Sequence, residues 1–185
     1  LLQFGNWVGG DRDGHPFVTP EVTKSTLQLL RNTALKLLQE KIVAFSASMT
    51  LSSTNNDVPT ILEKAIEEKL SQLGKAGINA VARNPMEPWR QFINLLILKL
   101  EHTISEKTDV PSKYYKNPSE LLADFKIIRT SLDEIHANKI SDELLFPLER
   151  HLQCFGFHLA KLDVRQNSNY YEIAVSQMLS TAGYE

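Results

Sequence analysis

Charged residues near the end of the chain have the types and spacing of an anion-binding site. They alternate with apolar ones in the order Ala160, Lys161, Leu162, Asp163, Val164 and Arg165. Alternation with a period of two predicts a strand that has one apolar face, so the three charged side chains share the opposite face. Asn167 and Ser168 follow at once and have the character of a helix start.

Arg165 is the last residue of that charged face, at the carboxyl end of a predicted short, buried strand. A guanidinium beside a new helix N-terminus suits an oxyanion such as phosphate. The alternative is an ion pair between Arg165 and Asp163 that only braces the strand, because structural ion pairs also occupy such places. These residues alone leave both interpretations open.

A second charged cluster lies at the start of the chain. Residues 4–16 are typical of a short strand that runs into a glycine-rich turn. If the extended backbone continues through Asp13, the side chains of Asp11 and Asp13 point one way and that of Arg12 the other. The two carboxylates would then need partners elsewhere, which indicates a larger polar site. The alternative is a charged turn that caps a strand.

Several other classes of site are excluded. The glycine-rich segment lacks the Gly-Lys-Ser/Thr ending of a P-loop and the spacing of a dinucleotide fingerprint. Its aspartates resemble a calcium loop only faintly, because the glycine comes too early and position twelve is Val22. The five histidines form no metal-ligand pair on one helix, and no serine or cysteine lies in a recognisable nucleophile motif. What remains from the residues alone is an arginine-based anion site at the strand ends.

Composition narrows the class of protein. The chain has 185 residues, 42% of them hydrophobic and 23% charged, which is typical of a soluble globular domain. A net charge of −2 without a basic run argues against nucleic acid as a partner. The apolar run at residues 95–98 is far too short to cross a membrane. The single cysteine, Cys154, excludes an intrachain disulfide and fits a reducing, cytoplasmic compartment.

The elements that must position these residues are mostly helical. Helices are expected from Thr19-Pro20 to about Ser46, from Pro59 to about Leu73, from Glu87 to about Lys107, from Asn117-Pro118 to about Ile135, from Ser141 to about Phe155, and from Ser168 to Thr181. We expect the first to bury Leu27, Leu30, Ala34, Leu37 and Leu38. Gly74, Gly77, Asn84 and Pro85 predict a mobile loop, and Asp109 to Lys116 a connector. Pro147 should cut or kink its helix, or move the start to about Phe146.

The predicted fold class is therefore mainly α, with about six helices and two short strands. The two strands could be neighbours in one parallel sheet, although alone they would form a poor sheet. Both charged clusters fall at the carboxyl ends of their strands. In a (β/α) barrel, residues in that position form the active site.

Long motifs at both ends of the chain resemble one enzyme family. Residues 4–20 are similar to the FGSW(M/I)GGDRDGNPxVT block of phosphoenolpyruvate carboxylases, and residues 155–168 resemble their FGFxLxxLDxRQES block. Between them, residues 87–103 resemble the family's YRxxL…RLxxT helix, and residues 115–132 its YxxPxEL…SL segment. The blocks occur in the family's order and span essentially the whole chain.

This resemblance implies a helical segment of a (β/α)-barrel-type enzyme, normally a homotetramer. The enzyme converts phosphoenolpyruvate and bicarbonate, with Mg²⁺ or Mn²⁺, into oxaloacetate and inorganic phosphate, an anaplerotic carbon fixation. The arginine of the LDxRQ motif, which is a phosphate ligand in the family, matches Arg165. The flanking Asp163 and Gln166, and Asp11, Arg12 and Asp13 of the GGDRDG loop, match residues near the site.

The resemblance also predicts that residues 1–185 are one internal segment of such an enzyme. The family's catalytic histidine would precede it, and its metal-binding acids would follow it. We therefore expect the segment alone to be inactive and to hold no metal. His15, Asn167 and Tyr171 depart from the family pattern, which leaves their hydrogen bonds open. The alternative function is a non-catalytic helical interaction module derived from the same fold.

Overall fold

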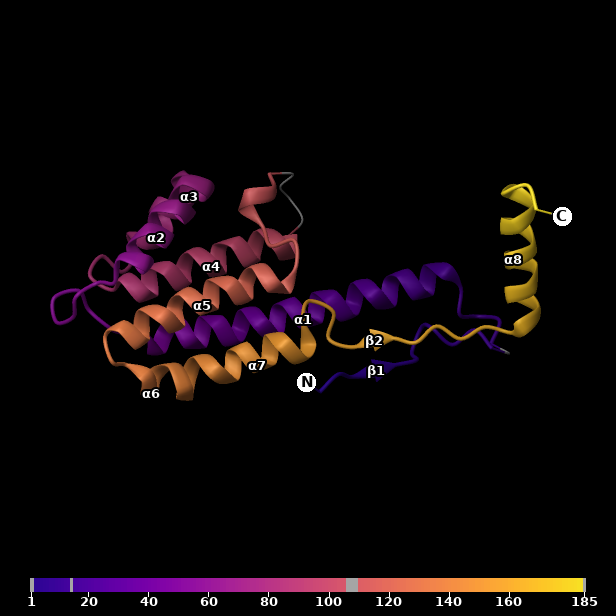
Figure 1. Ribbon diagram of the computed structural model, residues 1–185, viewed down its shortest axis with the longest axis horizontal. Helices are drawn as coiled ribbons and strands as arrows, with labels where there is room; N and C mark the ends of the chain where they lie inside the picture. The colour runs from indigo at the N-terminus through magenta and orange to yellow at the C-terminus, as the bar shows by residue number, and fades with distance from the viewer. Residues whose placement is uncertain (1, 14, 106–109, 185) are drawn as a thin grey trace.

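A computed structural model describes residues 2–13, 15–105 and 110–184 (Figure 1). The predicted helix end at Lys107 and the predicted connector start at Asp109 lie outside these residues. The helices are α1 (Pro20–Ser48), α2 (Thr60–Leu73), α3 (Lys75–Val81), α4 (Pro88–Ser105), α5 (Pro118–Glu134), α6 (Asn138–Ile140), α7 (Phe146–Phe155) and α8 (Ser168–Thr181), with a 3-10 turn, η1 (Pro111–Lys113), and a π-helical turn, η2 (Ser141–Leu145). The strands are β1 (Gly5–Asn6) and β2 (Lys161–Leu162). The described part of the chain is thus mainly helical, as predicted.

Helix α4 is the centre of a helical bundle and packs against α1, α2, α3 and α5. In Figure 1, α1, α4, α5 and α7 lie side by side along the length of the bundle. The face of α4 predicted to be apolar is buried, because its spacing keeps these side chains on one side of the helix. Its fully buried members include Trp89, Phe92, Ile93, Leu96 and Leu100.

Helix α1 begins where the sequence predicts, since the Thr19 hydroxyl accepts the Val22 N–H at 3.4 Å and Pro20 occupies the first turn. Its first buried residue is Ala34, however, and Leu27 remains 49% exposed. Leu37 is also exposed, so the predicted stripe is only partly right. The N-terminal half of α1 extends beyond the bundle toward β1 and β2 (Figure 1).

The prediction of a mobile loop after Leu73 is wrong for residues 75–81, which form α3. Gly74 ends α2 with a positive φ of 59°, a conformation that glycine adopts without strain. Gly77 is buried, and a Cβ there would lie 3.3 Å from the Leu95 side chain. This glycine therefore permits close packing of α3 on α4 instead of ending the helix.

The segment around Pro147 follows one of the alternatives left open. Helix α7 starts at Phe146, and the preceding turn is π-helical, with the Phe146 N–H bonded to the Ser141 carbonyl. Proline lacks an N–H for the helical ladder, which accounts for an irregular turn at this point. Ser141, where the sequence places the helix start, does not cap the helix: its hydroxyl is buried without a hydrogen-bond partner in the described part of the chain.

The strands β1 and β2 pair in parallel, with Gly5 opposite Lys161 and Asn6 opposite Leu162. This confirms the predicted pairing, and Phe4 joins β1 to the bundle by stacking on Phe155 at 5.3 Å. The strand was expected to be buried, but Val164 is 52% exposed. Parallel sheets are normally buried because helices pack on both of their faces. Within the described residues, this two-stranded sheet lacks such cover over Val164, so the side chain remains exposed.

Helix α8 follows the strands and stands apart from the bundle (Figure 1). It has no buried residue, although it carries apolar side chains such as Ile173 and Met178. Its start agrees with the prediction, because the Asn167 side chain accepts the Asn169 N–H at 3.0 Å. Within the described residues, no helix is long and apolar enough to span a membrane.

Candidate functional site

The two charged motifs meet because the parallel pairing continues past the strands. The Arg165 N–H donates to the Gly10 carbonyl at 3.0 Å, and the Arg12 N–H donates to the Arg165 carbonyl at 2.8 Å. These bonds place Asp11 directly opposite Arg165. Residues 154 positions apart in sequence therefore form one local structure.

The three charged side chains of the second strand lie on a common face, as their alternation predicts. Lys161 Nζ donates to the Gln3 side chain at 2.7 Å, and the Arg165 guanidinium lies 5.3 Å from the centre of the Trp7 ring. A Cβ on Gly5 would lie 3.1 Å from the Asp163 carboxylate. The contacted positions 3, 5 and 7 alternate along the first strand, so they share a face too.

The ion-pair partner of Arg165 is Asp11, whose Oδ2 lies 3.4 Å from Nη1. The predicted alternative, a brace between Arg165 and Asp163, is not formed among the described residues. Half of the Arg165 side chain and 36% of that of Asp11 are exposed. Water screens a pair of this kind, so it contributes about 0 to 1 kcal/mol to stability. The guanidinium thus remains accessible to a ligand.

Arg12 turns to the other face and joins the loop to α1. Its Nη2 donates to the Thr23 hydroxyl at 2.8 Å, and that hydroxyl donates to the Gly9 carbonyl at 2.7 Å. Arg12 Nε is buried without a hydrogen-bond partner in the described part of the chain. Arg12 and Gln166 line a cavity of about 720 Å³ at the start of α8. The two arginines therefore do not converge on one point.

Asp13 behaves differently from the prediction. The extended backbone ends before it, and its N–H turns back to the Asp11 carboxylate at 3.3 Å. Its own side chain is exposed. Asp13 therefore fits the alternative of a charged turn at a strand end. Asp11 fits the interpretation of a larger polar site, because its partner Arg165 is distant in sequence.

Two residues that complete this arrangement were not singled out from the sequence. Trp7 contacts Arg165, and Thr23 holds Arg12. Strand parity could have found Trp7, because positions 5 and 7 must share a face when β1 pairs with β2. Thr23 lies one helical turn after the N-cap residue Thr19, where a side chain can face the preceding loop.

The acidic residues near the site do not fit a metal centre. Among the described residues, no group of three or more histidine, cysteine, aspartate or glutamate side chains could hold a metal ion. A magnesium site needs several oxygen ligands in near-octahedral geometry, which Asp11, Asp13 and Asp163 do not supply together.

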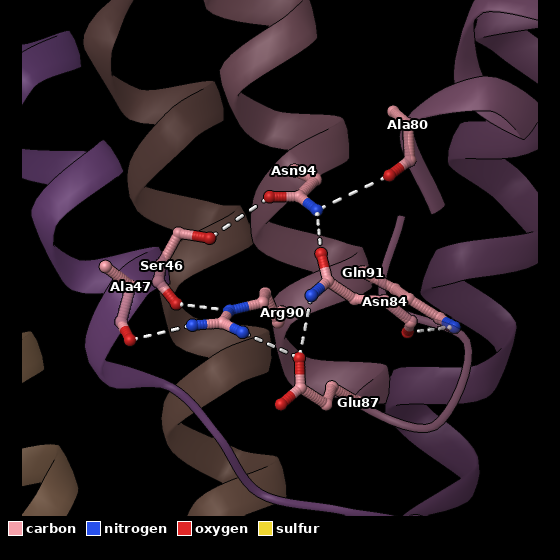
Figure 2. Close-up of polar contacts among 8 residues, drawn as sticks. All are labelled: Ser46, Ala47, Ala80, Asn84, Glu87, Arg90, Gln91 and Asn94. Carbon is pink, nitrogen blue, oxygen red and sulfur yellow. Dashed lines mark hydrogen bonds and ion pairs between the residues drawn. The ribbon is translucent and has the colours of Figure 1, made fainter. Parts of the chain in front are cut away.

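A second polar cluster surrounds Arg90 on α4 and serves the scaffold (Figure 2). Its guanidinium donates to the carbonyls of Ser46 and Ala47 at 2.8 and 2.7 Å, and to Glu87 at 2.8 Å. These carbonyls belong to the last turn of α1, where the regular helical ladder ends, and the Ser46 carbonyl also accepts the Met49 N–H at 3.1 Å. Because its donors are used in this way, Arg90 fixes the end of α1.

Comparison with known proteins agrees with the motifs. The phosphoenolpyruvate carboxylase family profile matches residues 1–185. An alignment that covers 91% of this chain gives 31% identity to the phosphoenolpyruvate carboxylase of Methylorubrum extorquens. An alignment that covers 100% of this chain gives 31% identity to that of Ralstonia nicotianae. The corresponding enzyme of Xanthomonas euvesicatoria is 32% identical, also over 100% of the chain. These alignments cover 18%, 19% and 20% of the relatives, so the chain spans about a fifth of their length.

The family profile covers every residue, including both ends of the paired motifs. The chain belongs to the phosphoenolpyruvate carboxylase family.

Proposed function

We propose that this chain is an internal segment of a phosphoenolpyruvate carboxylase and supplies part of its substrate phosphate site. The whole enzyme would convert phosphoenolpyruvate and bicarbonate into oxaloacetate and inorganic phosphate. The observation that carries the proposal is the pairing of Asp11 with Arg165, which joins the family's two longest motifs at the carboxyl ends of parallel strands.

In this proposal Arg165 binds the phosphate of phosphoenolpyruvate. A guanidinium presents paired N–H donors that match phosphate oxygens, and half of this side chain is exposed. Phosphoryl transfer depends mainly on positioning and on stabilising charge, so a fixed arginine contributes directly. Asp163 and Gln166 flank Arg165, and Asp11, Arg12 and Asp13 form the loop that faces it.

We also propose that the two strands belong to a (β/α) barrel completed by other parts of the enzyme. The half-exposed Val164 and the apolar side chains of α8 support this, since parallel strands are normally covered on both faces. Mg²⁺ or Mn²⁺, assembly as a homotetramer and a cytoplasmic location belong to the same proposal. The 185-residue chain alone would form no oxaloacetate.

Substitution of Arg165 in the full-length protein tests the proposal. Hydrogen bonds to a charged group contribute about 1.5 to 3 kcal/mol, so Arg165→Ala should lower kcat/KM for phosphoenolpyruvate by roughly 10- to 150-fold. Arg165→Lys keeps the positive charge but loses the planar pair of N–H donors, so its kcat/KM should lie between those of the wild type and Arg165→Ala. Arg150→Ala, on the exposed side of α7, is the matched control and should leave kcat/KM unchanged.

Two outcomes would contradict the proposal. Unchanged kinetics in Arg165→Ala would remove the phosphate role. A full-length protein that forms no oxaloacetate from phosphoenolpyruvate, bicarbonate and Mg²⁺ would favour the non-catalytic interaction module.

A further inference from the structure

Asp11 faces Arg165 across the extended sheet and is tied to the backbone on its other side. We propose that Asp11 is a positioning residue, which orients the Arg165 guanidinium for an incoming phosphate. This inference rests on the proposed function, because it assumes that Arg165 binds the substrate phosphate.

The two oxygens of the Asp11 carboxylate have separate tasks. Oδ1 accepts the Asp13 N–H at 3.3 Å, and Oδ2 lies 3.4 Å from Arg165 Nη1. The first contact restrains the carboxylate within the loop, so the second oxygen has a defined place. Because one carboxylate contacts both groups, it holds the guanidinium in a defined place relative to the loop backbone.

The guanidinium is restrained on one side and open on another. Besides Asp11, it contacts the face of Trp7, with 5.3 Å between the guanidinium carbon and the ring centre. Within the described part of the chain, the only hydrogen bond of the Arg165 guanidinium is the one that Nη1 donates to Asp11. Nη2 and Nε therefore remain for a phosphate, whose oxygens accept paired donors.

Hydrogen bonds on both sides of Asp11 also fix its backbone. Gly10 and Arg12, its two neighbours, both bond to the backbone of Arg165, at 3.0 and 2.8 Å. The carboxylate and the guanidinium therefore start from backbone atoms in fixed register. An arginine without such a partner keeps several rotamers, and binding a ligand would then cost the entropy of ordering it.

An opposite role is conceivable, in which Asp11 competes with phosphate for the guanidinium. The geometry favours positioning, because the contact is long, exposed to water and limited to Nη1. Such a pair neutralises little of the positive charge while it still selects one orientation. The two roles give opposite signs in a binding experiment.

Asp11→Asn is the sharpest substitution in the full-length enzyme. The amide keeps one oxygen for the Asp13 N–H, while its NH₂ group removes the acceptor for Arg165 Nη1. Asp57→Asn is the matched control, since it removes the same charge from an exposed aspartate in the loop between α1 and α2, away from both strands. Asp11→Glu retains the carboxylate and serves as the conservative variant.

We expect Asp11→Asn to raise KM for phosphoenolpyruvate about 3- to 5-fold, as for loss of one charge-assisted contact at an exposed position. The inhibition constant of inorganic phosphate should rise by the same factor, while KM for bicarbonate stays within twofold. Asp57→Asn should leave both constants within twofold of the wild type, and Asp11→Glu should recover most of the affinity. In an Arg165→Ala background, Asp11→Asn should have no additional effect.

The outcomes separate this inference from the proposed function. If Arg165→Ala leaves KM for phosphoenolpyruvate unchanged, the proposed function fails. If Arg165→Ala weakens binding but Asp11→Asn has no effect, tightens phosphate binding or acts additively with Arg165→Ala, the positioning role is wrong. Should Asp11→Asn lose its native circular dichroism spectrum, Asp11→Ser takes its place and is judged by the same criteria, because its hydroxyl can still accept the Asp13 N–H but offers Arg165 no negative charge.

Discussion

Gly10 packs directly against the backbone of Asp163, and a Cβ at position 10 would overlap the Asp163 carbonyl oxygen. The same Cβ would also lie 3.1 Å from the Leu162 side chain. A carbonyl group in a paired strand cannot rotate away as a side chain can. The close approach of the two motifs therefore requires glycine at this position.

Gly10→Ala should separate the loop from the second strand and misplace Arg165. In the full-length enzyme we expect KM for phosphoenolpyruvate to rise at least about tenfold, the effect of losing one good charge-assisted contact. Gly5→Ala is the control, because its Cβ would meet only the movable Asp163 carboxylate at 3.1 Å. Equal KM values in steady-state assays of the two variants would contradict this account.

Removing one partner of the buried ion pair between Lys69 and Asp124 should strongly destabilise the chain. Their charged atoms lie 2.8 Å apart with side-chain exposures of 10% and 6%, and the Tyr115 hydroxyl donates to the same carboxylate at 2.8 Å. Asp124→Ala leaves a buried ammonium unpaired and should lower the free energy of unfolding by about 3 to 5 kcal/mol. Urea denaturation of the 185-residue chain measures this.

Glu143→Ala is the matched control for that substitution. Glu143 lies 3.8 Å from Lys139 in a pair that is mostly exposed. Its removal should change the free energy of unfolding by less than about 0.5 kcal/mol. Similar losses in the two variants would show that burial of the Lys69–Asp124 pair has no special weight.

Acid should destabilise the chain through His151. Burial, and then the positive charge of Lys41, lower the pKa of His151 from its ordinary 6.5. The unfolded chain then binds this proton more tightly, so the free energy of unfolding falls as the pH drops from 6.5 through the lowered folded-state pKa. Denaturant titrations at several pH values should show a flatter dependence in His151→Gln. Lys41→Gln should also flatten it, and an unchanged slope in both variants would exclude His151 as the cause.

The sequence predicted the helices best where a local signal and the packing agree. Asn117 caps α5 as expected, with its side chain accepting the N–H groups of Ser119 and Glu120, and the period of 3.6 in α4 matches its buried face. The same period misled at Leu27, since it says which side chains share a face but not whether another helix covers them. At Gly77 a local preference against helix was outweighed by packing on Leu95.

For the candidate site, strand parity correctly put Lys161, Asp163 and Arg165 on one face. It could not identify Asp11 as the partner of Arg165, because that contact joins positions 154 residues apart. The burial of the strand was also predicted wrongly. Burial depends on which elements lie above Val164, and no pattern within the strand contains that information.

The separation between Asp11 and Arg165 has a consequence for how the protein is made. Closing a loop of 154 residues costs roughly 4 to 5 kcal/mol of chain entropy, while each backbone hydrogen bond between the strands contributes only about 1 kcal/mol. The helical bundle must therefore form first and bring its two ends together. At a synthesis rate of about 5 to 20 residues per second, the first strand waits roughly 8 to 30 s for its partner to leave the ribosome. During that interval its unpaired edge is open to other chains, so newly made protein at this stage should be the form that chaperones bind.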